Sequence, residues 1–296
     1  MSEVQHISPF PKMSMGNTKR KSALYLQKCK DEGKKIVQHC PSMLSPLFSM
    51  AAMIADVDIA RLAPSVDASY TADQTNEFAP NYIKSYRAVA NTLHLNYVCN
   101  AYTWCDKHTA LKNFVRYHQA DVDSMLPMGI NNETLKYVSD GQCIVYGHVG
   151  ALSGWMTNGL FGGYKKITSA SSNIKVFQGA YEYQENGMKA MSVELVPGEV
   201  SAAIAKKLRV PVIGIAGYAA CDGSEMVDED TFGIAGGIGA PIHAKTYGDF
   251  FEWAGGIYSQ WVNDVRTGAY PAEENMWHMD PVELEKFNEA FEKTYK

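Results

Sequence analysis

The sequence lacks the features that mark several large classes of protein. No apolar run approaches the roughly 18 residues of a membrane span, so we expect no membrane association. The first residues carry charges and prolines rather than an apolar stretch, which argues against a secretory signal. The formal net charge is -5 with both signs interspersed, and this pattern gives no basic footprint for nucleic acid.

Disulfide and nucleotide motifs are lacking too. The six cysteines include no C-x-x-C pair, and a chain of 296 residues does not need disulfides to hold its core. We therefore expect reduced thiols in a cytoplasmic protein. The Gly-rich stretch 214–223 contains neither G-x-G-x-x-G nor G-K-[ST], so it does not predict a nucleotide site.

Short apolar runs alternate with helical patterns along most of the chain. The predicted strands are 34–39, 57–62, 95–99, 120–126, 142–146, 190–193 and 210–215, with an eighth near 231–235. The predicted helices are 22–33, 44–55, 80–92, 109–119, 132–139 and 199–208. Such alternation implies a parallel sheet. Because no linker or repeat interrupts it, the pattern favours an α/β fold of the (β/α)8 TIM barrel type over an open doubly wound sheet.

The pattern divides the chain into three parts. Residues 1–21 are expected to form an N-terminal arm, and residues 22–248 the barrel that carries the chemistry. Residues 249–296 are expected to be helical and are rich in aromatic side chains, more than a barrel needs to close. We therefore expect this last segment to pack on the barrel or on a neighbouring subunit of a homo-oligomer.

Glu194 is the first candidate catalytic residue. It closes the apolar run 190–193 and stands three residues before Pro197, in a predicted β-α-β unit. Barrel enzymes keep their chemistry at the carboxyl ends of the strands, and a rigidly held carboxylate suits a general base. The alternative is that a strand-end acid simply pairs with an Arg or Lys.

His148 is the second candidate, in Gly147-His148-Val149-Gly150 directly after a predicted strand. A neutral imidazole at the barrel mouth could donate a hydrogen bond to a substrate oxygen. The alternative is a His satisfied by a neighbouring backbone group.

Six segments occur in an order that carries a family resemblance. They are GHVG at 147–150, FGGYK at 161–165, VELVPGEV at 193–200, VPVIGIAG at 210–217, DTFGIAGG at 230–237 and VRTGAYPAEE at 265–274. This order resembles the ketopantoate hydroxymethyltransferase (3-methyl-2-oxobutanoate hydroxymethyltransferase) family, whose barrels belong to the phosphoenolpyruvate mutase and isocitrate lyase superfamily. The resemblance runs from about residue 26 to residue 274 and is strongest after residue 147.

The resemblance implies a concrete reaction. A 2-oxo acid loses the proton next to its ketone, and the enolate adds to a one-carbon unit from methylene-tetrahydrofolate. Glu194 matches the family's base, and His148 matches its substrate-contacting His. Ser65 matches the serine of a metal-binding turn, while Tyr218 replaces a small residue and would either narrow the pocket or supply a hydroxyl donor. Asn100 is a further candidate donor to the substrate.

The sequence departs from the family where the family holds Mg²⁺. The three carboxylates that the resemblance implies are replaced by Pro64, Ala101 and Leu126. Because Mg²⁺ needs oxygen ligands, the usual metal site is expected to be lost. Asp67 could substitute only if its loop has shifted by three residues.

Three functions remain open on the sequence alone. The first is a divergent enzyme that makes or breaks a carbon–carbon bond next to a carbonyl without the usual metal. The second is a metal-dependent hydroxymethyltransferase that uses methylene-tetrahydrofolate, with Mg²⁺ held by a rearranged set such as Asp67, Asp121 or Asp123. The third is a catalytically silent paralogue with a binding or assembly role.

Overall fold

The computed structural model describes most of the chain, as residues 19–41, 45–64, 72–100, 103–151, 168–216, 219–234, 241 and 243–295. It separates into two compact units, Met1–Tyr247 and Gly248–Lys296.

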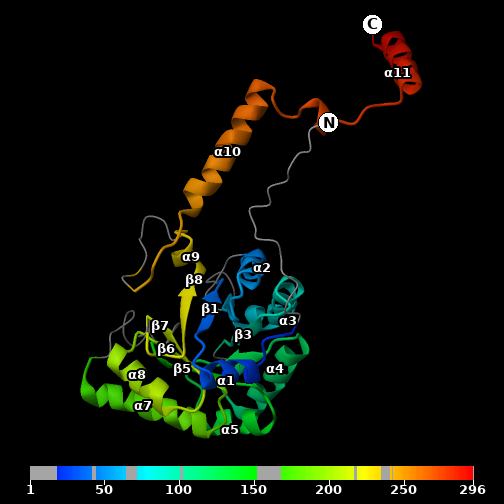
Figure 1. Cartoon of the computed structure of the whole chain (residues 1–296). Helices are drawn as coiled ribbons and strands as arrows, with labels where there is room; N and C mark the ends of the chain where they lie inside the picture. Colours follow the sequence, from blue (N-terminus) through cyan, green and yellow to red (C-terminus); the bar gives the residue numbers. More distant parts are fainter. Residues whose placement is uncertain are drawn as a thin grey trace. The chain divides into compact units, whose positions relative to one another are not determined.

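The first unit is built on a sheet of parallel strands (Figure 1). The strands are β1 (Ile36–Cys40), β2 (Ile59–Leu62), β3 (His94–Val98), β4 (Ser124–Leu126), β5 (Tyr146–Gly150), β6 (Ala190–Glu194), β7 (Val212–Ile215) and β8 (Gly223–Val227). The 8-stranded sheet has the order β4-β3-β2-β1-β8-β7-β6-β5, and a parallel bridge between Met125 and Val145 joins its two edges. The predicted (β/α)8 barrel is therefore confirmed.

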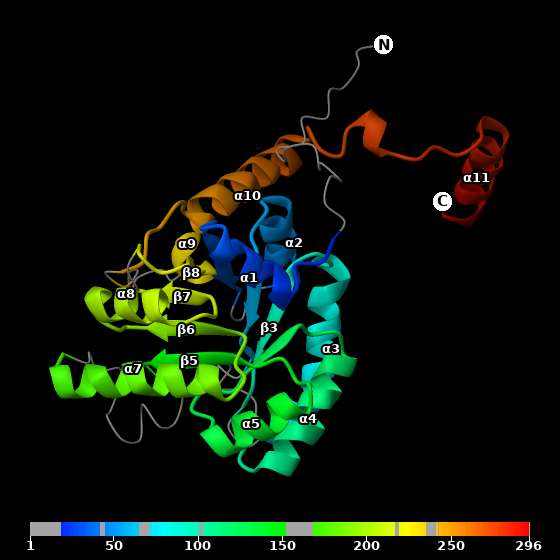
Figure 2. The same cartoon turned by 60° about the horizontal axis from the view of Figure 1, so that its bottom comes forward.

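Helices cover the outside of the barrel, as Figures 1 and 2 show. They are α1 (Ala23–Asp31), α2 (Pro46–Ile54), α3 (Ala72–Val89), α4 (Lys107–Gln119), α5 (Asn132–Asp140), α7 (Ala170–Glu185), α8 (Gly198–Lys207) and the short α9 (Asp228–Thr231). Several begin at a Ser, Asp or Asn whose side chain accepts a hydrogen bond from a backbone N–H of the first turn. These N-caps are Ser22, Ser45, Asp106, Asn131 and Ser169.

The N-terminal end of the barrel is closed by α1. Leu26 and Cys29 of this helix join an apolar cluster inside the barrel that draws residues from β1, β2, β4, β5, β6 and β7. The members of this cluster show which side chains point inward, and strand residues two positions away share that direction. The carboxyl ends of the strands form the opposite rim.

Three sequence-based boundaries are wrong. The eighth strand is Gly223–Val227, and residue 231 belongs instead to α9. This strand was missed because its inward position is Glu225 rather than an apolar residue. The strand predicted at 142–146 lies further along the chain, at Tyr146–Gly150. The third error concerns α3, which begins at Ala72 rather than at residue 80 and runs through Pro80.

Packing explains why α3 continues through its proline. Ala79, Ile83 and Tyr86 are fully buried on one face of this helix. Burial of these side chains outweighs the one backbone hydrogen bond that Pro80 cannot donate.

The second unit is helical, as expected. It contains α10 (Phe250–Thr267), the 3-10 helix η4 (Glu273–Asn275) and α11 (Pro281–Thr294). None of the residues in these three helices is buried, and their exposed apolar side chains include Phe251, Trp253, Trp261 and Phe287. Across the described residues, no helix is both long and apolar enough to cross a bilayer.

Candidate active site

Glu194 and His148 lie together at the rim formed by the strand ends. His148 stands inside β5 and Glu194 is the last residue of β6, where it pairs in register with Gly150. The His148 Nε2 and a Glu194 carboxylate oxygen are 3.4 Å apart. The Glu194 side chain remains 16% exposed, while that of His148 is 0% exposed. The carboxylate can therefore reach a solute in the barrel mouth.

A hydrogen bond to the backbone determines which ring nitrogen of His148 carries the proton. Nε2 lies 2.6 Å from the carbonyl oxygen of Ala151, so this nitrogen carries the proton and donates it to the backbone. Burial, together with the nearby positive charge of Arg61, lowers the pKa of His148 to about 4, so the ring is neutral. Nδ1 is then an acceptor, buried without a hydrogen-bond partner among the described residues. The structure thus favours the alternative in which the backbone satisfies this His, since its one N–H is not directed to a substrate.

The surroundings of Glu194 make it a stronger base than an exposed carboxylate. Burial raises its pKa above the ordinary value, although the positive charge of Arg61 acts in the opposite direction. A carboxylate that holds its proton more tightly gains driving force for removing one from carbon.

Below the rim, a network of polar side chains crosses the barrel interior. Arg61 Nε lies 2.5 Å from Glu225 Oε1, an ion pair without good hydrogen-bond alignment at these two atoms. Gln38 donates to the other oxygen of Glu225 and accepts a 2.9 Å bond from the hydroxyl of Tyr146. Burial raises the pKa of Glu225 to about 7, despite the opposing effect of Arg61. The network joins β1, β2, β5 and β8.

Three neighbouring strands end in the left-handed backbone region. Gly150 has φ 99°, Leu195 directly after Glu194 has φ 53°, and Ala216 after β7 has φ 55°. A residue with a Cβ is strained in this region, by about 1–2 kcal/mol, and such strain gathers at functional sites. The backbone around Glu194 is therefore held in one conformation by its surroundings.

The other predicted site residues divide into two groups. Asn100 lies two residues beyond β3, and its backbone carbonyl accepts hydrogen bonds from the amide and the hydroxyl of Thr103. Its role toward a substrate stays a prediction. Ser65, Asp67 and Tyr218 lie outside the described residues.

The positions that the resemblance assigns to Mg²⁺ do not fit a metal where they are described. Leu126 packs in the apolar cluster inside the barrel, and Pro64 is buried and carries no side-chain oxygen. Ala101 lies outside the described residues. Over the described ranges, no group of three or more His, Cys, Asp or Glu side chains could hold an ion.

Asp121 and Asp123 do not rescue the metal site. They precede β4, at the end of the barrel opposite Glu194, and both pair with Arg20 and Arg87. Asp123 also accepts the backbone N–H of Leu95. Their placement contradicts the suggestion that they bind a catalytic metal.

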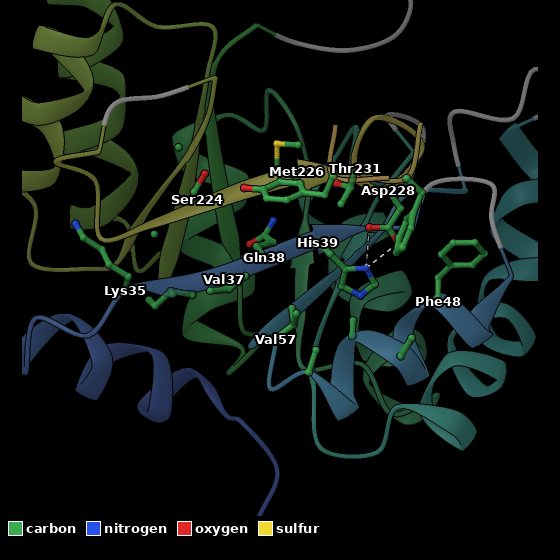
Figure 3. Close-up of a pocket in the computed structure, with 18 of the residues that line it drawn as sticks. Lys35, Val37, Gln38, His39, Phe48, Val57, Ser224, Met226, Asp228 and Thr231 are labelled. Carbon is green, nitrogen blue, oxygen red and sulfur yellow. Dashed lines mark hydrogen bonds and ion pairs between the residues drawn. The ribbon is translucent and has the colours of Figure 1, made fainter. Parts of the chain in front are cut away.

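A hollow of about 920 Å³ lies on the outer side of β1 and β8, away from Glu194 (Figure 3). Beside it, His39 of β1 contacts Asp228 at 3.0 Å through Nδ1, and Ser49 of α2 at 3.2 Å through Nε2. This series of contacts, from serine to histidine to aspartate, resembles the catalytic triad of hydrolases, but Ser49 is 0% exposed and cannot reach a substrate. These three side chains therefore tie α2, β1 and α9 together, and we assign them no catalytic role.

Arg61 and Glu225 were missed from the sequence. Each lies within a short strand, IARL or GSEMV, and strand patterning alone does not assign a charged residue there to a site. The available signal was a charge in a strand whose neighbours are apolar, since parallel strands are buried on both faces and a charge there needs a partner.

Comparisons with known proteins identify relatives of this sequence. The sequence profile of the ketopantoate hydroxymethyltransferase family matches residues 20–273. The 3-methyl-2-oxobutanoate hydroxymethyltransferase of Chloroflexus aggregans is 40% identical over 115 residues, which are 39% of this chain and 41% of that protein. The enzyme of the same name from Nitrosopumilus maritimus is 33% identical over 183 residues, or 61% of this chain and 64% of the relative. The matched stretches thus span less than two thirds of the length of these relatives.

The solved structures support the fold alone. The carboxyl transferase domain of Rhizobium etli pyruvate carboxylase, with pyruvate and biocytin, is 12% identical with a TM-score of 0.53, and the match covers 96% of this chain and 52% of that one. The match of the family profile over residues 20–273 covers most of the sequence. The chain therefore belongs to the ketopantoate hydroxymethyltransferase family.

Proposed function

We propose that this protein is an enzyme of 2-oxo acid chemistry in which Glu194 removes the proton next to the ketone. In the bond-forming direction the enolate then attacks an electrophilic carbon; in the bond-breaking direction cleavage of the carbon–carbon bond leaves the enolate, and the acid form of Glu194 returns the proton. The observation that carries this proposal is the placement of Glu194, which ends β6 at the rim with a partly exposed carboxylate and a raised pKa. The matched relatives are named for 3-methyl-2-oxobutanoate, a 2-oxo acid.

The proton transfer balances within the site. The carboxylate of Glu194 accepts the proton from carbon and becomes a carboxylic acid. The electrons of the C–H bond form a carbon–carbon double bond, and the carbonyl oxygen becomes the enolate oxygen. Neutral His148, 3.4 Å away, adds no positive charge that would weaken the base. The left-handed Leu195 holds the carboxylate on a rigid backbone.

We further propose that the reaction does not use the family's usual magnesium site. Pro64 and Leu126 stand where the resemblance implies carboxylates, and neither offers an oxygen ligand. The second candidate is a metal-dependent hydroxymethyltransferase with methylene-tetrahydrofolate; the names of the relatives favour the hydroxymethyl transfer. The third is a silent paralogue that only binds or assembles.

The remaining expectations are proposals as well. Exposed aromatic side chains on α10 and α11 support packing of the C-terminal segment on the barrel or on another subunit of a homo-oligomer. All six cysteines are thiols, five of them buried, which supports a cytoplasmic protein.

Hydrogen exchange at carbon tests the proposal. The protein is incubated with 3-methyl-2-oxobutanoate in D2O, first with EDTA and then with added Mg²⁺, and loss of the C3 proton is followed by NMR. We expect exchange in EDTA and a loss of at least about 100-fold in Glu194→Gln, since general-base catalysis contributes about 10²–10⁴-fold. The control is Glu199→Gln, the same chemical change at an exposed acid of α8, which should leave the rate unchanged.

Each other outcome favours a different reading. Exchange only after Mg²⁺ is added indicates the metal-dependent transferase. No exchange with a panel of 2-oxo acids indicates the silent paralogue. Equal exchange by Glu194→Gln and wild type removes Glu194 as the base.

A further inference from the structure

Arg61 places a positive charge inside the barrel, next to the proposed base. Ile59, two residues earlier on β2, belongs to the cluster inside the barrel, so Arg61 also points inward. Its side chain is 8% exposed, and its charge acts on both Glu225 and Glu194. The guanidinium therefore lies between the interior network and the rim.

The nitrogens of the Arg61 guanidinium differ in their contacts. Nε faces Glu225 at 2.5 Å, and the Cys40 thiol also contacts the side chain. Nη1 is buried and has no hydrogen-bond partner within the described part of the chain. Leaving a buried cationic donor without an acceptor costs free energy, because the group has lost its hydrogen bonds to water. A guanidinium edge can bind a carboxylate through two parallel hydrogen bonds.

Asn96 is a second buried polar side chain without a hydrogen-bond partner among the described residues, and it lies next to Arg61. The two residues are register partners on β3 and β2, so their side chains lie side by side on the same face of the sheet. Asn96 is 0% exposed, and neither its Nδ2 nor its Oδ1 has a partner among the described residues. Buried amides are rarely left in this state unless water or a ligand satisfies them.

The charge of a 2-oxo acid explains why such a site would be needed. The substrate brings a carboxylate close to Glu194, which must itself be ionised to act as a base. Two carboxylates that lie close together repel each other, and a neighbouring cation offsets this repulsion. The family resemblance implies that a metal ion neutralises the substrate carboxylate. In this chain, two of the positions that the resemblance assigns to metal ligands are Pro64 and Leu126, which carry no side-chain oxygen.

We propose that Arg61, through Nη1, and Asn96 bind the carboxylate of the 2-oxo acid and take over the anion-binding role of the metal. The inference rests on the proposed function for the identity of the ligand. The competing view is that Arg61 only balances the charge of Glu225.

The test compares an acid with its neutral ester. Binding of 3-methyl-2-oxobutanoate and of its methyl ester to EDTA-treated protein is measured by calorimetry. Because charge-assisted hydrogen bonds carry the recognition, we expect wild type to prefer the acid by about 100-fold. The double variant Arg61→Met/Glu225→Met removes the ion pair without leaving one charge buried alone, and it should bind both ligands equally.

Two single variants and a control sharpen this test. Arg61→Lys keeps the charge but loses the planar fork, and it should weaken acid binding about 10-fold with little effect on the ester. Asn96→Leu should also weaken acid binding. Arg116→Met, on α4 outside the barrel, should bind both ligands as wild type does.

The outcomes separate this inference from the proposed reaction. If the double variant folds and still prefers the acid, or if wild type shows no preference, the inference is wrong. If the double variant does not fold, Arg61→Lys decides: unchanged acid binding overturns the inference. Arg61-dependent acid binding without hydrogen exchange supports the binding site and contradicts the proposed reaction.

Discussion

Gly150 is the position where one added carbon should damage both the fold and the base. It pairs in register with Glu194, and its φ of 99° lies in the left-handed region. A Cβ built on Gly150 would lie 2.1 Å from the carbonyl oxygen of Glu194 and 2.6 Å from a methyl group of Val196. The nearest atom is backbone, so the end of β6 must move. Strain of about 1–2 kcal/mol and overpacking of about 1–3 kcal/mol together predict that Gly150→Ala loses about 2–5 kcal/mol of stability.

The same displacement should affect catalysis separately. A shift of about 1 Å at a reacting group can lower the rate about 100-fold, so hydrogen exchange should fall even in the fraction that remains folded. Urea unfolding measures the first effect, and the NMR exchange assay measures the second at a temperature where the variant is folded. The control is Gly179→Ala in α7, where an added Cβ meets nothing within 4 Å and should gain about 0.5–1 kcal/mol. If Gly150→Ala matched wild type in both assays, the backbone at the rim would not be rigid.

Two further variants test the opposite end and the interior of the barrel. Asp123→Asn should lower the free energy of unfolding by about 2–3 kcal/mol, because it removes the nearer and more buried of the two carboxylates that pair with Arg87, and added Mg²⁺ should not restore it. Glu225 has a folded pKa of about 7, raised from 4.5, so the stability it contributes is present below about pH 4.5 and is lost as the pH rises through 7. Between pH 4.5 and 8, the free energy of unfolding of wild type should therefore fall by roughly 3 kcal/mol more than that of Glu225→Gln. Urea unfolding at a series of pH values measures both, and parallel curves of stability against pH would contradict this.

The sequence was most informative where apolar periodicity decides the local structure. The strands at 190–193 and 210–215 and the helix at 199–208 correspond to β6, β7 and α8, and Glu194 lies at the predicted strand end. A continuous apolar run followed by one acid is a strong signal, because parallel strands are buried on both faces.

Periodicity failed where polar residues point inward. Glu225 interrupts the apolar character of β8, so the apolar pattern predicts a strand near residue 231 instead. The sequence does not point to Arg61 either, because its partner Glu225 is 164 positions away and only closure of the barrel brings the two together. The tautomer of His148 depends on the Ala151 carbonyl, a contact that strand prediction does not give.

The pH dependence of hydrogen exchange tests most directly the claim that a buried Glu194 is the base. Burial raises the pKa of Glu194 above its ordinary value of 4.5, so the exchange rate of wild type should fall on the acid side with a midpoint above that value. Glu194→Gln should lack this acid limb and retain only a slow residual rate. An acid limb of the same midpoint and height in Glu194→Gln would contradict the account.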